Sequence, residues 1–415
     1  MRGATLEIPQ VVAPPATRPF EELGVSAAVV EALAMREIDG AFAIQALVLR
    51  DAIAGRDVLG RSQTGSGKTL AFAIPIVERL HANGRSPNAL ILVPTRELAS
   101  QVAEEFRAIA DIKQLQVATV YGGVGIAAQA KRARRSDIVI ATPGRLLDLL
   151  ARKLLRLDRV RICVLDEADR MLDMGFLPDV KRILEELQPE RQTMLFSATL
   201  DGEVGRLAER FTHDAVLHEV ADHRASVNEA THRFIAVPHE GKTAALVREL
   251  AADRGLTLIF VRTKRGADRL ARNLKQQGFQ VGALHGDMSQ PQRERALGLF
   301  AAGRNDVLVA TDVAARGLDL EHISHVINFD PPGDEKAYVH RVGRTARAGR
   351  TGEGITFVTP QQVEDVRVIA RRLDLHAEFE RAGMRAEKAP PAAPRQRHRP
   401  RRPQQPQQNR RRSRR

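Results

Sequence analysis

Two adjacent carboxylates, Asp166 and Glu167, stand directly after a mostly apolar run over residues 161–165. Such a run predicts a buried strand of a parallel sheet, and ligands of open α/β sheets bind beyond the carboxyl ends of the strands. Because two like charges side by side repel, we expect the two groups to have different roles. Asp166 is then the partner of Mg²⁺, largely through water, and Glu167 is the general base for an attacking water.

A second chemical segment lies earlier, between a predicted strand and a predicted helix, and consists of Thr64, Gly65, Ser66, Gly67, Lys68 and Thr69. Its glycines leave room for backbone N–H groups to surround a phosphate. Lys68 would reach the β- and γ-phosphates of a nucleoside triphosphate, and the Thr69 hydroxyl would bind Mg²⁺. The strict pattern has a glycine where this chain has Ser62, but the strand before and the helix after still indicate a phosphate loop.

Cations for a developing phosphoryl charge come from residues 340–350, where histidine, arginine and glycine are interleaved. Arg344 and Arg347 are three positions apart and share one face if the segment is helical. The planar and permanently charged guanidinium suits a transferring phosphoryl group. The alternative is an exposed basic helix without a chemical role, and the interleaved His340 and glycines weigh against it.

The elements that must position these groups alternate along the chain as is typical of doubly wound parallel sheets. Predicted strands of the first half end at residues 60, 95, 142, 166 and 199, and helical patterns cover 69–80, 97–110 and 178–187. Predicted strands of the second half cover 256–261, 281–285, 306–310, 325–329 and 354–358. A chain of 415 residues is also too long for one typical core, so two domains are predicted.

The predicted fold class is therefore α/β, with two tandem domains, each a parallel sheet flanked by helices, and a disordered basic tail. The predicted limits are an arm over 1–18, domain 1 over 19–220, a linker over 221–229, domain 2 over 230–377 and a tail over 378–415. The arm is rich in Pro and Ala, and the tail is a low-complexity mixture of Ala, Pro, Gln and Arg.

The two halves resemble each other in two short segments. Residues 258–263 resemble residues 90–95 at an offset of 168, and residues 306–311 resemble residues 137–142 at an offset of 169. Two matches at nearly one offset indicate a duplicated domain, although apolar strands ending in Thr are common. Each half would then present a Thr at corresponding strand ends.

Positive charge is concentrated at the C-terminal end. Residues 388–415 contain eleven Lys or Arg and no acid, so a net charge of +13 leaves only +2 for the rest of the chain. Such a tail favours a polyanionic partner, and the alternative is a merely solubilising segment. With no Trp and two Tyr, contacts to a nucleic-acid backbone are favoured over stacking on bases.

No apolar run is long enough to span a membrane, and residues 1–19 contain no apolar segment of the signal-peptide type. Cys163 is the single cysteine, which excludes an intramolecular disulfide and fits a reducing cytoplasm. Its place inside the predicted strand indicates a small buried hydrophobe rather than a reactive thiol. We therefore expect a cytoplasmic protein with no membrane partner.

Taken together, these segments make the chain resemble the DEAD-box family of ATP-dependent RNA helicases over about residues 20–375. The segments that carry the resemblance occur in the family's order and are Gln45, 62–69, 94–98, 122–123, 142–145, 166–169, 197–199, 285–287, 310–319 and 340–347. The resemblance implies two RecA-like domains that close over ATP and RNA together. The chain looks like a short bacterial member of this family with a basic tail.

The resemblance also implies roles for individual residues. Adenine recognition falls to Phe20 and Gln45, a further nucleotide contact to Asp319, and the arginine fingers are Arg344 and Arg347. The residues that would couple hydrolysis to strand separation are Asp169, Ser197, Thr199 and His340. RNA backbone contacts would come from Thr95, Arg96, Gly123, Thr142, Gly144 and Arg145 in domain 1, and from Thr263, Gly286, Thr311 and Arg316 in domain 2.

The segment ahead of Gln45 departs from the family. The usual Gly-aromatic pair is replaced by Glu37-Ile38, and the usual Pro-Thr or Pro-Ser by Ala41-Phe42, so the hydroxyl contact expected at position 42 is absent. The predicted function is an ATP-dependent RNA helicase that hydrolyses ATP on binding RNA and locally unwinds short duplexes or remodels ribonucleoprotein. A DNA-directed helicase or translocase, and an RNA chaperone acting through the basic tail, stay open as alternatives. Ribosomal or RNA-decay proteins could be its partners.

Overall fold

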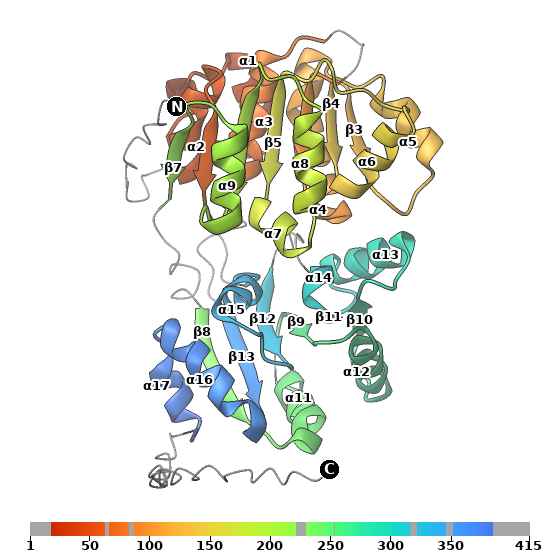
Figure 1. Ribbon diagram of the computed structural model, residues 1–415. Helices are drawn as coiled ribbons and strands as arrows, with labels where there is room; N and C mark the ends of the chain where they lie inside the picture. The colour runs from red at the N-terminus through yellow and green to blue at the C-terminus, as the bar shows by residue number, and fades with distance from the viewer. Residues whose placement is uncertain are drawn as a thin grey trace, which may run out of the picture.

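Two parallel sheets flanked by helices make up the structure, a computed structural model that describes residues 18–62, 66–82, 87–220, 230–252, 254–315, 322–345 and 352–384. Figure 1 shows them as two domains, with the first half of the chain in the upper one and the second half in the lower one. The predicted α/β class with two tandem domains is confirmed. The linker predicted over 221–229 and the first 17 residues of the arm predicted over 1–18 lie outside the described residues, whereas Arg18 forms a bridge to Ala41.

Domain 1 contains a seven-stranded sheet in the order β3-β4-β2-β5-β6-β1-β7, in which every pair of neighbours is parallel. Its strands are β1 (Val58–Arg61), β2 (Ala89–Leu92), β3 (Val117–Val120), β4 (Ile138–Ala141), β5 (Ile162–Asp166), β6 (Gln192–Ser197) and β7 (Val216–Glu219). Parallel strands place all their carboxyl ends at one edge, and this brings the ends of β1, β5 and β6 side by side.

The helices of domain 1 are α1 (Ala27–Ala34), α2 (Ala43–Ile53), α3 (Lys68–Arg79), α4 (Arg96–Ala110), α5 (Ile126–Ala133), α6 (Pro143–Ala151), α7 (Ala168–Asp173), α8 (Leu177–Glu185) and α9 (Gly202–Phe211), with the short 3₁₀ helices η1 (Glu21–Leu23) and η2 (Asp111–Lys113). Several begin directly at a strand end. Thr95 caps α4, because its Oγ1 accepts a hydrogen bond from the N–H of Leu98 at 3.2 Å. Helix starts and strand ends therefore meet at the same edge of the sheet.

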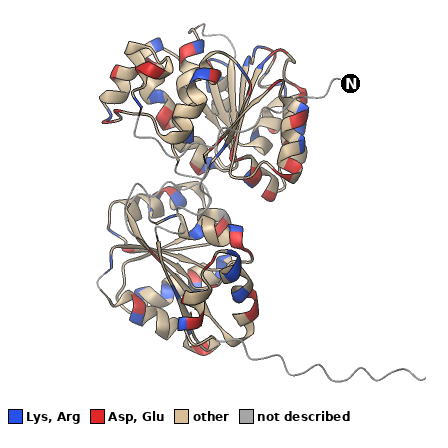
Figure 2. Ribbon diagram, turned by 90° about the vertical axis from the view of Figure 1, so that its left-hand side faces the viewer, with Lys and Arg blue, Asp and Glu red and all other residues tan. Residues whose placement is uncertain are grey.

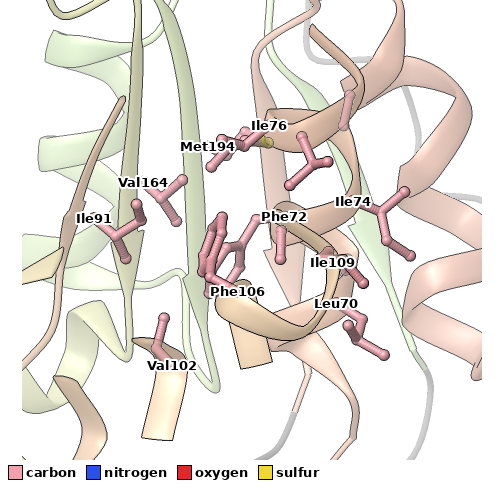
Figure 3. Packing of buried hydrophobic residues seen from close by; sticks show 14 of the residues in the cluster. Leu70, Phe72, Ile74, Ile76, Ile91, Val102, Phe106, Ile109, Val164 and Met194 are labelled. Carbon is pink, nitrogen blue, oxygen red and sulfur yellow. The ribbon is translucent and has the colours of Figure 1, made fainter. Parts of the chain in front are cut away.

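Apolar side chains cover both faces of this sheet. On one face the rings of Phe72 and Phe106 lie 6.0 Å apart, centroid to centroid (Figure 3). The ring of Phe196 lies 5.4 Å from that of Phe72. Each ring is fully buried and stabilises the fold by about 1.5–3 kcal/mol. Cys163 on β5 packs into the cluster on the other face with no exposed surface, as predicted, and burial raises the pKa of its thiol to about 12.

Domain 2 contains a six-stranded parallel sheet in the order β10-β11-β9-β12-β13-β8. Its strands are β8 (Ala230–Ala236), β9 (Leu256–Phe260), β10 (Val281–Leu284), β11 (Val307–Ala310), β12 (Ile323–Asn328) and β13 (Gly352–Val358). Its helices are α11 (Lys242–Leu250), α12 (Lys264–Gln276), α13 (Gln290–Ala301), α14 (Asp312–Ala315), α15 (Glu335–Val342), α16 (Val363–Arg372) and α17 (His376–Arg381), with η3 (His239–Gly241) and η4 (Pro360–Gln362).

The two sheets share one plan. The first six strands of the domain 1 order match the six of domain 2, and β7 is the strand that domain 2 lacks. The register repeats as well, since Leu92 pairs with Ala141 and Phe260 pairs with Ala310. These pairs are separated by the offsets of 168 and 169 that the sequence shows, so the structure supports a duplication.

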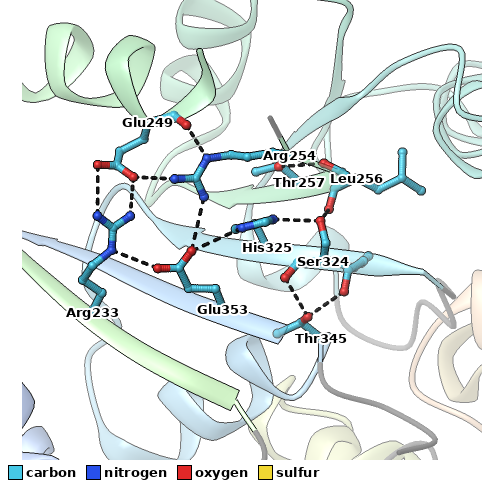
Figure 4. A network of polar contacts seen from close by, with 11 residues as sticks. Arg233, Glu249, Arg254, Leu256, Thr257, Ser324, His325, Thr345 and Glu353 are labelled. Carbon is cyan, nitrogen blue, oxygen red and sulfur yellow. Dashed lines mark hydrogen bonds and ion pairs between the residues drawn. The ribbon is translucent and has the colours of Figure 1, made fainter. Parts of the chain in front are cut away.

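A polar network crosses the second sheet (Figure 4). Glu353 on β13 accepts hydrogen bonds from Arg233 and Arg254, and both arginines also pair with Glu249 on α11. His325 on β12 joins Glu353 at 3.2 Å. Figure 4 shows the network continuing through Ser324 to Thr345, whose hydroxyl donates to the carbonyl oxygens of Ile323 and Ser324. Four elements of domain 2 are thereby fixed to the segment that follows α15.

The C-terminal limit predicted for domain 2 is wrong. The folded chain continues past residue 377, because α17 extends to Arg381 and both Phe379 and Met384 pack into an apolar cluster with Phe234. The ring of Phe379 meets that of Phe234 edge-on at 5.4 Å. The tail therefore begins no earlier than residue 385, and residues 385–415 lie outside the described part of the chain.

Both signs of charge are spread over the helices of the two domains (Figure 2), in keeping with the small net charge outside the tail. In the part of the chain that the structure describes, no helix combines the length and the apolar character that crossing a membrane requires.

Candidate functional site

Lys68 begins α3 and is held inside the predicted phosphate loop. Its Nζ donates a hydrogen bond to the carbonyl oxygen of Ser62 at 2.9 Å, and only 6% of the residue is exposed. Gly67 before it has a φ of 81°, the left-handed conformation that glycine adopts without strain. A Cβ at Gly67 would also lie 2.5 Å from Nε2 of Gln45, so the loop requires glycine here. Two further predicted loop residues, Thr64 and Gly65, lie outside the described residues.

Asp166 faces Lys68 from the end of β5 and is 3% exposed. Burial raises the pKa of its carboxyl to about 7, although the positive charge of Lys68 opposes this rise. Burial likewise lowers the pKa of Lys68, and the charges of Asp166 and Glu167 offset part of that shift. Oδ1 of Asp166 has no hydrogen-bond partner among the described residues. A buried oxygen in this state is expected to receive water or a cation from outside the protein.

Glu167 has a strained backbone and a fixed side chain. Its φ of 54° and ψ of 49° are left-handed values that cost a non-glycine residue about 1–3 kcal/mol. Its Oε2 accepts a hydrogen bond from Nη1 of Arg170 at 2.8 Å, and both side chains are almost fully buried. No local sequence pattern marks Arg170 as a site residue. Its role becomes visible only when the turn into α7 brings the two charges together.

Three of the predicted coupling residues are in contact. Ser197 at the end of β6 is fully buried, and its Oγ accepts hydrogen bonds from the backbone N–H groups of Asp169 and Thr199, each at 3.3 Å. β6 is the neighbour of β5, so this contact links the carboxylate turn to the adjacent strand end. The fourth, His340, lies on α15 in domain 2.

Gln45 connects the start of α2 to the phosphate loop. Its Oε1 accepts the backbone N–H of Phe42 at 2.9 Å, and its Nε2 donates to the carbonyl oxygen of Gly67 at 2.8 Å. Phe20, expected beside adenine, is 1% exposed and packs into the apolar core of domain 1. Phe42 is the exposed aromatic residue of this region.

Two of the arginines predicted to contact RNA in domain 1, Arg96 and Arg145, hold the loop that contains Gly123. A Cβ at Gly123, where φ is +85°, would overlap the guanidinium of Arg96. From the other side, Nη1 of Arg145 donates to the carbonyl oxygen of Val124 at 2.9 Å. The remaining members stand at helix starts, with Thr95 capping α4 and with Thr142 and Gly144 at the first turn of α6.

In domain 2 the predicted RNA-contact residues again gather at strand ends. The Oγ1 of Thr263 accepts from the N–H of Gly266 at 3.0 Å and so caps α12. A Cβ at Gly286 would lie 3.4 Å from Cε of Lys264, which the sequence analysis did not single out. Thr311 follows β11, and its N–H donates to the carbonyl oxygen of Leu284 at 3.2 Å.

Arg341 is the most heavily bonded arginine next to the predicted finger. Its Nε and Nη2 bind the two carboxylate oxygens of Asp312 at 2.6 and 2.7 Å, and Nη1 donates to Oδ1 of Asn328 and to the carbonyl oxygen of Asp330. Arg344 lies one turn on and lines a small hollow together with Asp312 and Arg341. Arg341 therefore fixes the position of the segment that carries the finger.

An ion pair between described residues joins the two domains. Nε of Arg293 on α13 lies 2.8 Å from Oε1 of Glu97 on α4, and the two side chains are 11% and 8% exposed. The same guanidinium donates to the carbonyl oxygens of His285 and Ala314. Arg293 thus contacts three segments that adjoin predicted RNA residues. No local pattern identifies this pair, because its members are 196 positions apart.

Three further site residues, Arg316, Asp319 and Arg347, lie outside the described part of the chain. The structure accordingly brings together the described part of the phosphate loop, the carboxylates and three of the four coupling residues at the edge of domain 1, while His340 lies in domain 2. It places the described RNA-contact residues in two groups, one in each domain.

Comparison with known proteins agrees with this geometry. The DEAD/DEAH box helicase profile matches residues 42–207, and the helicase conserved C-terminal domain profile matches residues 241–349. Among curated proteins, the DEAD-box ATP-dependent RNA helicase CshA of Geobacillus kaustophilus is 42% identical, over 85% of this chain and 76% of that protein. CshA of Bacillus subtilis is 41% identical over 84% of this chain and 71% of that protein.

Solved structures of similar fold include helicases with bound RNA. Saccharomyces cerevisiae Dbp5 bound to RNA and ADP BeF3 has a TM-score of 0.78 at 30% identity, covering 86% of this chain and 94% of that chain. Mss116p bound to ssRNA and AMP-PNP has a TM-score of 0.77 at 28% identity, covering 86% and 78%. The two sheets and their strand-end sites define a two-domain helicase. More specifically, the chain belongs to the DEAD-box family of ATP-dependent RNA helicases.

Proposed function

We propose that this RNA-stimulated ATPase hydrolyses ATP at the carboxyl end of β5, and that hydrolysis drives local separation of short RNA duplexes or remodelling of ribonucleoprotein. The observation that carries the proposal is the buried Oδ1 of Asp166, which lacks a partner among the described residues and lies near buried Lys68. A site with both a carboxylate and an ammonium withdrawn from water favours a ligand that brings a cation and a polyanion together. ATP with Mg²⁺ is such a ligand.

Mg²⁺ fits the residues at this site. We assign it to Thr69 and Asp166, largely through water. Asp166 offers one buried carboxylate oxygen without a partner among the described residues, which suits an ion held mainly by phosphate and water. When bound, Mg²⁺ would neutralise charge on the β- and γ-phosphate oxygens.

The protein's own side chains would bind the nucleotide, accept the proton and stabilise the developing charge. Lys68 and the loop N–H groups would bind the phosphates, and Gln45, Phe20 and Asp319 would form the nucleotide-base side of the site. Glu167, held by Arg170, would take the proton of the water that attacks the γ-phosphorus as ADP leaves. Arg344 and Arg347 would stabilise the charge that develops on the phosphoryl oxygens.

RNA binding is proposed along the two groups of strand-end residues. Dbp5 and Mss116p, which have the same two-domain fold, were solved with RNA bound. The residues assigned to the sugar–phosphate backbone are Thr95, Arg96, Gly123, Thr142, Gly144, Arg145, Thr263, Gly286, Thr311 and Arg316. The contact of Ser197 with Asp169 and Thr199, together with His340, would transmit the state of the nucleotide to this surface.

Three further assignments are part of the proposal. Residues 19–220 and the chain from residue 230 to at least 384 are taken as the two domains, joined by the linker 221–229. The basic tail would add RNA affinity through phosphate contacts. A cytoplasmic location stays a prediction from the single Cys163.

The test compares ATP hydrolysis without nucleic acid, with single-stranded RNA and with single-stranded DNA of equal length. We expect RNA to raise the rate, DNA to raise it far less, and Glu167→Gln to abolish the rise while leaving RNA binding intact. Equal stimulation by RNA and DNA would favour the DNA-directed alternative. A rate that does not respond to RNA, or that survives Glu167→Gln, would contradict the proposal.

A further inference from the structure

Phe42 is an exposed aromatic side chain at the start of α2. It precedes α2 as its N-cap residue, and 54% of it is accessible to solvent. Most other large apolar residues of domain 1 are buried in its two clusters. Single exposed apolar residues are common on protein surfaces, so the position of this ring, and not its exposure alone, indicates a role.

The ring borders the phosphate loop. A Cβ placed on Gly67 would lie 2.6 Å from Cδ2 of Phe42, so the ring rests against the Gly67 backbone. Lys68, which we assign to the β- and γ-phosphates, is the next residue. When this loop holds the phosphates of a nucleoside triphosphate, the sugar and base must therefore extend over a neighbouring surface that includes Phe42.

Hydrogen-bonding capacity for reading a base edge is small at this surface. Gln45 has no exposed area, and its amide already binds the N–H of Phe42 and the carbonyl oxygen of Gly67. One N–H and one lone pair of that amide remain for a ligand. Position 42 itself contributes a phenyl ring and no donor or acceptor.

We propose that Phe42 determines nucleotide specificity by forming one wall of the base site, and that stacking on its ring allows the enzyme to use GTP, CTP and UTP as well as ATP. Every base has a π-face, so stacking tolerates all four, whereas discrimination between bases needs hydrogen bonds to their edges. The inference rests on the proposed ATPase and concerns only how its site treats the base.

The test measures kcat and KM for hydrolysis of ATP, GTP, CTP and UTP by the full chain at saturating RNA. We expect the four kcat/KM values of the unmodified protein to lie within about tenfold of one another. Phe42→Ala should raise KM for all four nucleotides by about 5- to 50-fold with little change in kcat. Phe42→Tyr keeps the aromatic face and should retain the unmodified behaviour.

Two controls keep the result interpretable. Ile112→Ala removes another exposed apolar side chain of domain 1 and should leave all KM values unchanged. Phe42→Leu keeps apolar volume without a π-face, so it should behave like Phe42→Ala. An unmodified protein that prefers ATP more than about 100-fold, or an unchanged KM in Phe42→Ala, would overturn the inference. Absence of RNA-stimulated hydrolysis with every nucleotide would instead contradict the proposed function.

Discussion

Lys68 and Lys242 each begin the helix that follows equivalent strands, β1 in one sheet and β8 in the other. Both lie within a Gly-Lys-Thr sequence, residues 67–69 and 241–243. Each also faces an acid at the end of an equivalent strand, Asp166 after β5 and Asp330 just beyond β12. The duplicated plan therefore supplies two lysine–aspartate arrangements, one in each domain.

The two arrangements differ in whether the charges satisfy each other. Nζ of Lys242 lies 2.7 Å from Oδ1 of Asp330, while Nζ of Lys68 donates to a backbone carbonyl oxygen. Burial acts to raise the pKa of Asp330, but hydrogen bonds from Lys242 and from the N–H of Arg262 outweigh it and hold the pKa below its ordinary value. At Asp166 burial prevails, and the pKa rises to about 7.

The comparison of the two lysine–aspartate arrangements shows that the shared fold alone does not make a binding site. In domain 2 the 3₁₀ helix η3 stands where domain 1 has its glycine loop, and the ammonium already has an anion beside it. Domain 1 leaves equivalent charges buried without pairing them to each other, which costs folding free energy that a ligand can recover. We infer that domain 2 uses the motif for stability, whereas the proposed function assigns it to phosphate binding in domain 1.

The largest expected effect concerns Lys68, the domain 1 lysine of this comparison. Lys68→Ala should lower the RNA-stimulated ATPase rate by about 100- to 1000-fold, because it removes a preorganised cation from the phosphates. Its melting temperature should change little, since Lys68 forms no ion pair among the described residues. Steady-state hydrolysis and thermal unfolding check the two halves of the prediction. A variant that retains a tenth of the rate would place the phosphates elsewhere.

Lys242→Ala should have the opposite effects, a lower stability with little change in hydrolysis. It leaves Asp330 charged and largely buried, so the free energy of unfolding of domain 2 should fall by about 2–3 kcal/mol while hydrolysis by the folded protein persists. Because the pKa of Asp330 is lowered in the folded state, the pair stabilises above the ordinary value of 3.8 and loses this effect as pH falls through the folded pKa. The two proteins should therefore converge in stability in acid.

The matched control is Lys264→Ala. Lys264 also pairs with an aspartate, Asp287, but their side chains are 54% and 68% exposed. An exposed pair contributes about 1 kcal/mol at most, so this variant should unfold nearly as the unmodified protein does. Equal losses in the two variants would contradict the assignment of Lys242 to a buried structural pair.

Communication between the domains should depend on Arg293 and Glu97. Arg293→Ala should reduce RNA-stimulated hydrolysis about tenfold, because it removes a buried interdomain ion pair worth about 1–2 kcal/mol. Glu97→Ala should have a similar effect, and the double variant should be no worse than either single one. Arg295→Ala, an exposed neighbour on α13, is the control. Fully additive losses would indicate that the two residues act separately.

The smallest effect is expected at the tail. Truncation after Glu387 should weaken RNA binding severalfold at low salt and flatten the dependence of log affinity on log salt, because fewer counterions are released. The hydrolysis rate at saturating RNA should stay unchanged. An unchanged salt slope would mean that the tail does not contact RNA. Duplex melting that survives Glu167→Gln but is lost on truncation would support the chaperone alternative.

Local patterns predicted the domain 1 site because its parts are local. Asp166 and Lys68 were found from an apolar strand and a glycine spacing, each within about ten residues. Contacts that only the folded chain creates were not found, such as Lys242 with Asp330, 88 positions apart, and Glu97 with Arg293. Phe20 was assigned to the nucleotide from the family resemblance, and no local pattern shows that it also packs into the core of domain 1.

Three strands were also absent from the prediction. β3 is half-buried and only four residues long, β7 is a partly exposed edge strand, and β8 alternates between exposed and buried positions. Such short or edge strands show little continuous apolar character. The helix α17 was missed because its composition merges with the tail, and only the packing of Phe379 and Met384 shows that it is folded.

The burial of Cys163 allows introduced cysteines to be labelled selectively, so that domain closure can be observed. The only thiol of the chain has no exposed surface and a strongly raised pKa, so maleimide dyes should leave it unmodified in the folded protein. A cysteine introduced on the surface of each domain could then be labelled without removing the native one. The distance between the two dyes would report domain closure in single molecules as nucleotide and RNA bind.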